Sequence, residues 1–291
     1  MRLFELIGNT PLVELAQIPT RPNVKVYCKL EGQNPGGSVK DRAAFFMIKE
    51  ALRRGDINRA DRLVEATSGN TGIALAMMAQ LLGVQMTLIM PDNSTRERVV
   101  SMEAYGAKVI LTPAERTIEY SRELAEQMHR EEGYFMLNQF ANPDNLMSHY
   151  RTTGPEIWRD TEGEVTHFVS AMGTTGTIMG VSKYLKEQNP KIHIVGTQPT
   201  EGSSIPGIRR WSPDFLPKIF DASRVDQIID VSEEEAVRMT RRMAKEEGIM
   251  AGMSSGGALH AALKIAEGLD SGLIVCIACD RGDRYLSSDL F

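Results

Sequence analysis

The sequence predicts an α/β protein built on open, mainly parallel, twisted sheets with helices on both faces. Short, continuously apolar runs typical of buried strands alternate along the chain with longer amphipathic stretches typical of helices. The predicted strands are Val24–Leu30, Arg62–Ala66, Val84–Met90, Lys108–Leu111, His167–Ala171, Ile192–Thr197, Gln227–Val231 and Leu273–Ala278. The predicted helices are Lys40–Arg54, Thr71–Leu82, Arg96–Tyr105, Thr117–Arg130, Ile178–Glu187, Glu233–Glu247 and Gly257–Glu267. Ser94 with Glu97, and Ser232 with Glu235, have the spacing of a capping box at a helix start.

The length of 291 residues and a break in the strand series near residue 145 predict two domains. We expect a larger domain from residues 1–35 and 146–291, and a smaller one from residues 36–145. Ligands of open α/β sheets bind beyond the carboxyl ends of the strands. The residues that carry chemistry should therefore follow the predicted strands directly.

Composition excludes several classes of function. A net charge of −5 provides no overall basic field to attract nucleic acid or anionic lipid. No apolar run reaches the roughly 18 residues of a membrane span, and the N-terminus shows no signal-peptide pattern. The three cysteines give no disulfide framework, and Cys276 and Cys279 would face opposite sides of a strand, so we expect no metal site. The expected setting is a reducing cytoplasm.

Two loops that join a strand to a helix are suited to binding anions. The sequence Thr-Ser-Gly-Asn-Thr-Gly at 67–72 combines hydroxyls, an amide and two glycines at a helix start, as a carboxylate cradle would, although an ordinary helix cap uses the same residue types. The sequence Gly-Thr-Thr-Gly-Thr at 173–177 has the small residues and hydroxyls of a phosphate-binding loop. It matches neither the Walker A nor the dinucleotide fingerprint, so a phosphate outside a nucleotide fits it better.

Lys40 follows the turn Pro35-Gly36-Gly37 and lies in the first turn of a predicted helix that Ser38 can cap. The positive end of a helix disfavours an ammonium group, so we expect the pKa of Lys40 to be lowered. A neutral amine is the form that reacts with carbonyl groups to form a Schiff base. The sequence thus offers a candidate for covalent binding of a carbonyl cofactor.

Taken together and in order, these loops resemble those of the O-acetylserine sulfhydrylases of the fold-type II pyridoxal-phosphate family. The resemblance extends from Ile7-Gly8-Asn9-Thr10-Pro11-Leu12 to Arg284-Tyr285-Leu286-Ser287 and also includes Gly252-Met253-Ser254-Ser255-Gly256-Gly257. It implies a two-domain, tryptophan synthase β-like fold whose smaller domain moves on substrate binding, and it implies a homodimer.

The resemblance also implies how pyridoxal 5'-phosphate is held. Lys40 would form the internal aldimine, Asn70 would bind the ring hydroxyl, and Ser254 would meet the pyridine nitrogen. The phosphate would be held by Gly173, Thr174, Thr175, Gly176 and Thr177. A serine need not keep the pyridine nitrogen protonated, so the ring is a weaker electron sink that favours elimination over transamination.

The implied reaction is β-replacement. Thr67, Ser68, Thr71 and Gln139 would bind the α-carboxylate of O-acetyl-L-serine. Lys40, released when the external aldimine forms, would take the α-proton. Acetate would leave an α-aminoacrylate to which a sulfur nucleophile adds, giving L-cysteine.

Two segments indicate the B-type of this family, which accepts thiosulfate as well as sulfide and gives S-sulfo-L-cysteine from it. Arg209 and Arg210 lie on a Pro/Gly-rich loop and are suited to binding a dianion. Cys279 and Asp280 stand in the segment 278–285, where the A-type commonly has Pro-Ser-Ser-Gly-Glu-Arg-Tyr. We expect them to line the pocket.

Three alternatives remain open. The first is a sulfhydrylase that uses O-phosphoserine, whose phosphate Arg209 could bind. The second is an enzyme of the cystathionine β-synthase type, although 291 residues leave no room for its extra regions. The third is a scaffold that binds a partner, since A-type relatives form a complex with serine acetyltransferase. The altered segment 278–285 argues against that complex.

Overall fold

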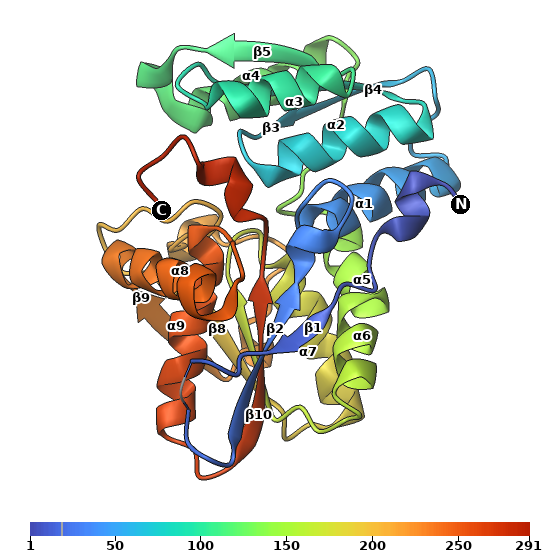
Figure 1. Ribbon diagram of the computed structural model, residues 1–291. Helices are drawn as coiled ribbons and strands as arrows, with labels where there is room; N and C mark the ends of the chain where they lie inside the picture. The colour runs from blue at the N-terminus through green and yellow to red at the C-terminus, as the bar shows by residue number, and fades with distance from the viewer. Residues whose placement is uncertain (19) are drawn as a thin grey trace. The chain divides into compact units, whose positions relative to one another are not determined.

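The computed structural model describes residues 1–18 and 20–291. They form two compact units, and each contains one sheet with helices packed on it (Figure 1). The first unit comprises Met1–Ile7 and Lys40–Asn145, and the second comprises Gly8–Val39 and Leu146–Phe291. The predicted α/β class with mainly parallel sheets is confirmed. Among these residues, no helix is long and apolar enough to cross a membrane.

The second unit holds a sheet of six strands in the order β1-β2-β10-β7-β8-β9. These strands are β1 (Leu12–Glu14), β2 (Val24–Leu30), β7 (His167–Ala171), β8 (His193–Pro199), β9 (Gln227–Val231) and β10 (Gly272–Ala278). β1 runs antiparallel to β2, and the other pairs are parallel. The loops after β2, β7, β8 and β10 consequently emerge at one end of the sheet, where ligands of such sheets bind.

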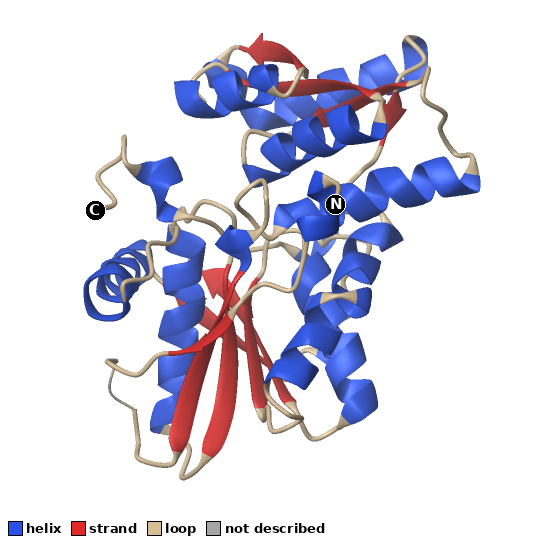
Figure 2. Cartoon of the chain, turned by 45° about the vertical axis from the view of Figure 1, so that its right-hand side comes forward, coloured by secondary structure: helices blue, strands red, loops and turns tan. Residues whose placement is uncertain are grey.

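Helices cover both faces of this sheet (Figure 2). On one face, α6 (Thr153–Asp160) and α7 (Gly176–Gln188) pack on a core that contains Phe168. On the other, α8 (Glu233–Glu247) and α9 (Met253–Glu267) pack on a core that contains Val169. Both residues are fully buried, which explains why neighbouring positions of this strand are apolar rather than only alternate ones.

The first unit holds a parallel sheet of four strands in the order β5-β4-β3-β6. Its strands are β3 (Arg62–Ala66), β4 (Gln85–Pro91), β5 (Lys108–Thr112) and β6 (Phe135–Met136). Its helices are α1 (Lys40–Arg54), α2 (Asn70–Leu82), α3 (Arg96–Ala104) and α4 (Thr117–Glu131). Leu63 packs in a core with residues of α1 and α2, whereas Val64 packs with residues of α4, so helices cover both faces here too.

The remaining helices are short. α5 (Pro143–Arg151) begins in the first unit and ends in the second. The 3-10 helices are Leu3–Leu6, Glu31–Gln33, Ala114–Arg116, Pro213–Phe215, Ala222–Arg224 and Gly282–Tyr285. They fill the connections between the longer elements and add little core of their own.

The structure adds to the predicted elements and corrects one helix start. The sequence did not predict β1, β6, α5 or α6, which are two to nine residues long. Ser232 forms the predicted capping box with Glu235, but α3 is preceded by Thr95 and not by Ser94. Residues 1–7 pack in the first unit rather than with the larger one, because Phe4 stacks on Phe45 of α1 with ring centroids 5.3 Å apart.

Candidate active site

The loop at 173–177 joins β7 to α7 in the second unit. Thr174 and Thr175 are buried, and Thr175 adopts the left-handed conformation with φ of 68° at the N-cap of α7. Thr177 Oγ1 lies 3.3 Å from Nε2 of His149, and the Nδ1 of that histidine lies 2.9 Å from Thr153 Oγ1. The N-terminal N–H groups of a helix and two or three hydroxyls thus converge on one turn, which is the donor set that a phosphate requires.

Thr175 in this loop has a side-chain hydroxyl that the described protein residues leave unsatisfied. Its Oγ1 is buried and has no hydrogen-bond partner among residues 1–18 and 20–291. A buried hydroxyl without a partner costs about 1–3 kcal/mol, so most native proteins avoid it. A hydrogen-bond acceptor such as a phosphate oxygen would relieve this cost, so the loop fits a phosphate group.

The segment 205–211 packs against the phosphate loop. The backbone N–H of Arg209 donates to Met172 O at 2.9 Å, and Trp211 Nε1 donates to Gly173 O at 2.9 Å. Position 173 has no room for a side chain, because a Cβ added there would lie 2.5 Å from Gly207 O. The two backbones therefore approach each other closely at glycine residues, which explains the small residues of both segments.

The two predicted arginines of this segment have different surroundings. The guanidinium of Arg209 lies 5.6 Å from the ring centroid of Trp211. Arg210 forms an ion pair of 2.8 Å with Asp230 of β9 and also donates to Pro199 O. Hydrogen bonds from Gln198 and Arg210 hold the pKa of Asp230 below its usual range. Arg210 is therefore paired with a carboxylate, and the backbone of Arg209 lies beside the phosphate loop.

Ser254 lies in the first turn of α9 and is buried. A Cβ added to Gly207 would lie 3.5 Å from Ser254 Oγ, so Gly207 stands between this serine and Gly173. The phosphate loop, the segment 205–211 and the start of α9 thus meet at the carboxyl end of the six-stranded sheet. This is the place predicted for them from their positions after strands.

The segment 279–285 follows β10 and holds the start of α9 in place. The hydroxyl of Ser255 accepts a hydrogen bond from the backbone N–H of Cys279 at 2.9 Å. The buried carboxylate of Asp280 accepts from Gly252 N–H at 3.1 Å and from the hydroxyl of Tyr285 at 2.6 Å. Asp280 is thus a structural acceptor in the wall of the site, and Cys279 is partly exposed beside it.

The same segment also binds the chain just before Lys40. Val39 N–H donates to Cys279 O at 2.8 Å, and Ser38 forms an antiparallel bridge with Asp280. The guanidinium of Arg284 donates to Gly36 O. Residues 36–39 are therefore anchored to the second unit by backbone pairing, and α1 begins at Lys40, the next residue. The first-turn position of Lys40 is confirmed, and its lowered pKa stays a prediction.

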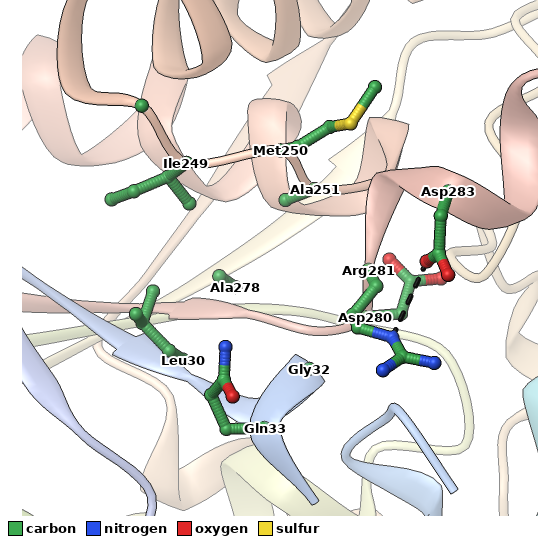
Figure 3. Close-up of a pocket in the computed structure, with 11 residues that line it drawn as sticks. Leu30, Gly32, Gln33, Ile249, Met250, Ala251, Ala278, Asp280, Arg281 and Asp283 are labelled. Carbon is green, nitrogen blue, oxygen red and sulfur yellow. Dashed lines mark ion pairs between the residues drawn. The ribbon is translucent and has the colours of Figure 1, made fainter.

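A cavity of about 340 Å³ lies beside the segment 279–285 (Figure 3). It is lined by residues at the end of β2, between α8 and α9, and at the end of β10 and just after it: Leu30, Gly32, Gln33, Gly248, Ile249, Met250, Ala251, Ala278, Asp280, Arg281 and Asp283. Arg281 and Asp283 form an ion pair of 3.4 Å at its rim. One side of Asp280, Arg281 and Asp283 therefore faces this cavity.

The predicted carboxylate loop lies in the first unit, between β3 and α2. Thr67 and Thr71 are buried, and Ser68 is partly exposed. Asn70 is the first residue of α2, and the N-cap is Gly69, which has no side chain to cap the helix. Because the cap offers no competing acceptor, the first N–H groups of α2 and the hydroxyls of the loop can act on an anion together.

Gln139 is brought to this loop from the end of β6. It is buried, and its Oε1 accepts a hydrogen bond from Thr71 Oγ1 at 2.9 Å. The backbone N–H of Asn138, next to it, donates to Glu65 of β3 at 3.0 Å. Glu65 was not among the residues predicted for the site. A carboxylate inside an otherwise apolar predicted strand was the available signal.

The predicted site residues thus fall into two sets, one in each unit. The first unit contains Lys40, Thr67, Ser68, Asn70, Thr71 and Gln139. The second contains Gly173, Thr174, Thr175, Gly176, Thr177, Arg209, Arg210, Ser254, Cys279 and Asp280. In the described part of the chain, no group of three or more His, Cys, Asp and Glu side chains is placed to hold a metal ion. These features define an α/β enzyme class that binds a small phosphorylated group at a helix start.

Comparison with known proteins identifies that class. Residues 3–280 match the family described as pyridoxal-phosphate dependent enzyme. The chain is 58% identical to cysteine synthase B of Pseudomonas aeruginosa, over 99% of this chain and 97% of that protein. It is 55% identical to cysteine synthase B of Escherichia coli, over 99% and 95%. The crystal structure of a cysteine synthase from Entamoeba histolytica superposes with a TM-score of 0.94 at 39% identity, covering 100% of this chain and 90% of that one.

The chain therefore belongs to the pyridoxal-phosphate dependent enzymes and, within them, to the family of the cysteine synthases B. The family model fixes the cofactor as pyridoxal phosphate, in agreement with the unsatisfied phosphate loop.

Proposed function

We propose that the chain catalyses the β-replacement of O-acetyl-L-serine by a sulfur nucleophile, giving L-cysteine and acetate. The observation that carries this proposal is the buried, unpartnered hydroxyl of Thr175 in a loop that otherwise has the donors of a phosphate site. Family membership supports the cofactor, and the carboxylate loop with Gln139 supports an amino acid as the substrate.

Residues of both units would hold the cofactor. Lys40 would bind it covalently, Asn70 would bind its ring hydroxyl, and the loop 173–177 would bind its phosphate. Ser254, whose hydroxyl lies near Gly207, would face the pyridine nitrogen. When bound, pyridoxal phosphate withdraws electrons from the substrate α-carbon and so allows acetate to leave from the β-carbon.

The chain's own groups then position the amino acid and move one proton. Thr67, Ser68 and Thr71 would bind the α-carboxylate, Thr71 through its backbone N–H because its hydroxyl donates to Gln139, and the amide N–H groups of Gln139 would help. The neutral amine of Lys40 would take the proton from the α-carbon and later return it. Because the carboxylate is held at one end and the cofactor at the other, the C–H bond is presented to Lys40 in a single orientation.

Arg209 would decide the choice of sulfur donor. Its guanidinium is positioned beside the Trp211 ring, while its backbone is bonded to the end of β7. A dianion such as thiosulfate gains from a nearby guanidinium more than the small sulfide does. We therefore propose S-sulfo-L-cysteine as a second product. Arg210 takes a smaller part, because Asp230 already pairs with it. Cys279 would line the pocket beside the donor.

The proposal includes a setting and an assembly. We infer a reducing cytoplasm, because the three cysteines form no disulfide among the described residues. We also infer a homodimer that forms no complex with serine acetyltransferase and binds neither nucleic acid nor membrane. The molecular mass in solution, measured with and without serine acetyltransferase, tests the homodimer and the absence of that complex.

A paired assay tests the reaction and its donor. The purified holoenzyme is given O-acetylserine or O-phosphoserine, each with sulfide or with thiosulfate, and both products are quantified. We expect turnover of O-acetylserine with both donors. Arg209→Ala should lower turnover with thiosulfate about tenfold and with sulfide less than about twofold, because it removes a charge-assisted contact to a dianion. Arg210→Ala is the matched control and should change neither donor selectively.

Lys40→Ala separates the chemistry from the fold. This variant should retain its circular dichroism spectrum but lose turnover and the borohydride-sensitive visible absorption of the bound cofactor.

Equal losses with both donors in Arg209→Ala would refute the anion role. Faster turnover of O-phosphoserine than of O-acetylserine would establish the O-phosphoserine sulfhydrylase instead. Product formation only when homocysteine replaces the two sulfur donors would establish an enzyme of the cystathionine β-synthase type. A protein without visible cofactor absorption after addition of pyridoxal phosphate would refute the enzyme proposal.

A further inference from the structure

Glu65 is a buried carboxylate that no part of the reaction uses. It lies near the end of β3, two residues before Thr67, and only 4% of the surface of Glu65 is exposed. Carboxylates are almost never buried to this extent without partners. Its Oε2 accepts the backbone N–H of Asn138 at 3.0 Å, and the N–H of Gln139 donates to it as well.

The carboxylate of Glu65 supplies hydrogen-bond acceptors where the pairing between β3 and β6 stops. β6 pairs with β3 only at Leu63 and Val64 and ends at Met136. The chain then turns away, and Asn138 adopts a left-handed conformation with φ of 52°. Backbone N–H groups at that turn lose the partners that a longer strand would provide, and the Glu65 carboxylate supplies them.

The turn that Glu65 holds carries Gln139. The backbone oxygen of Gln139 accepts from Asn145 Nδ2 at 2.8 Å, and its side chain accepts from Thr71 Oγ1 at 2.9 Å. This bond uses the single proton of the Thr71 hydroxyl and occupies the carbonyl oxygen of Gln139, so the Nε2–H groups of Gln139 are the donors that its side chain can offer to an anion. Displacing Asn138 would therefore move Gln139 and these donors.

The charge of Glu65 depends on the same contacts. Burial raises the pKa of Glu65 to about 7, against the lowering effects of the N–H groups of Asn138 and Gln139. The charged group that acts on it from the neighbouring helix is Arg122 of α4, which also lies 4.8 Å over the ring of Phe140. Above this pKa, the carboxylate can accept both N–H groups; below it, the protonated form keeps one good acceptor oxygen.

We propose that Glu65 is a positioning residue for the substrate carboxylate, acting through the turn at 138–139 on Gln139, whose side chain is fixed by its bond to Thr71. This inference rests on the proposed function, since it assigns the turn to the carboxylate site of that reaction. In its ionised form Glu65 holds the turn by two charge-assisted hydrogen bonds, and in its protonated form it holds the turn more weakly.

The test compares wild type with Glu65→Gln, a neutral side chain of the same shape, at about pH 6 and about pH 8. At saturating sulfide, the ratio of KM for O-acetylserine, variant over wild type, should be near one at the lower pH and about tenfold at the higher pH, because only ionised Glu65 differs from glutamine in acceptor strength. The ratio cancels the titration of the substrates. The value of kcat should change less than about twofold.

The matched control is Glu50→Gln, which alters another buried glutamate of the same unit, paired with Arg53 at 2.7 Å. Its KM ratio should be the same at both pH values. A ratio for Glu65→Gln that is constant with pH would overturn the proposal, because a purely structural role predicts a constant loss. Wild type without turnover would instead refute the proposed function.

Amide hydrogen exchange gives a second reading that does not depend on turnover. The amides of Asn138 and Gln139 should exchange several-fold more slowly in wild type than in Glu65→Gln at about pH 8, and at similar rates at about pH 6, since the hydrogen bonds that protect them are charge-assisted only above the pKa. Equal exchange rates of the two proteins at both pH values would contradict the proposed contact.

Discussion

Thr175 has a conformation and a hydroxyl that both cost stability in the absence of a ligand. A β-branched residue with φ of 68° is strained, and its buried Oγ1 lacks a partner. Such costs persist where the surrounding structure imposes them, and the helix α7 and the approach of Gly207 to Gly173 impose them here. The residue is therefore organised for a ligand rather than for the fold.

Thr175→Val tests this with two effects of opposite sign. Valine keeps the shape and the strain but removes the unpartnered hydroxyl, so the cofactor-free variant should be more stable than wild type by about 1 kcal/mol. The same change should weaken binding of pyridoxal phosphate about tenfold, because one phosphate hydrogen bond is lost. Urea unfolding of the apoprotein and equilibrium titration with the cofactor measure the two effects.

Thr197→Val serves as the control for that prediction. The hydroxyl of Thr197 in β8 is also buried without a partner among the described residues, but it lies within a strand and not in the phosphate loop. Its replacement should stabilise the apoprotein similarly and leave cofactor affinity unchanged. If Thr175→Val destabilises the apoprotein and binds the cofactor as tightly as wild type, the phosphate role of its hydroxyl is wrong.

At the scale of elements, the segment 279–285 connects two parts of the site. It pairs with residues 36–39 by backbone hydrogen bonds and holds the start of α9 through Asp280 and Ser255. A displacement of this one segment would therefore disturb both the chain entering Lys40 and the turn carrying Ser254. The segment lies between the adjacent cavity, which Asp280, Arg281 and Asp283 line, and a hydrophobic core that contains Tyr285.

The variants Asp280→Ala and Tyr285→Phe test how strongly these hydrogen bonds stabilise the segment 279–285. The first leaves Gly252 N–H and the Tyr285 hydroxyl without their acceptor and should lower the free energy of unfolding by about 2–3 kcal/mol. The second removes only the bond of 2.6 Å and should cost about 1 kcal/mol. Both should lower cofactor affinity in the same order. Urea unfolding and cofactor titration provide the values, and a Tyr285→Phe variant less stable than Asp280→Ala would contradict the assigned hierarchy.

The long elements could be predicted because burial on both faces leaves a continuous apolar run, as at Phe168 and Val169. β6 could not, because two residues hold no periodicity and its pairing with β3 is decided by tertiary contacts. Ser94 had the spacing of a cap, but Thr95 stands at the N-cap of α3 and its side chain forms no capping hydrogen bond. At the site, motifs in loops that follow strands led to the predicted residues. Glu65 and His149 contact residues of these regions but carry no motif of their own, so the sequence did not single them out.

At the scale of the whole molecule, the chain passes between the two units at residues 7–8, 39–40 and 145–146. The residues proposed for the cofactor phosphate belong to the second unit, and those proposed for the substrate carboxylate belong to the first. A substrate joined to the cofactor is bound at both ends, so it favours whichever arrangement of the units lets both sets act at once. From the family resemblance, we propose that the smaller unit moves when substrate binds.

Small-angle scattering of the holoenzyme tests this movement. Addition of L-alanine, an amino acid that has the carboxylate but no leaving group, should decrease the radius of gyration, because its binding is strongest where both sets of residues engage it. Thr71→Ala removes a hydroxyl of the carboxylate loop without touching the phosphate loop, so it should weaken the response to L-alanine while the cofactor stays bound. An unchanged scattering profile at an L-alanine concentration that saturates the visible spectral change would show that the units keep their arrangement, and the substrate would then select no closed state.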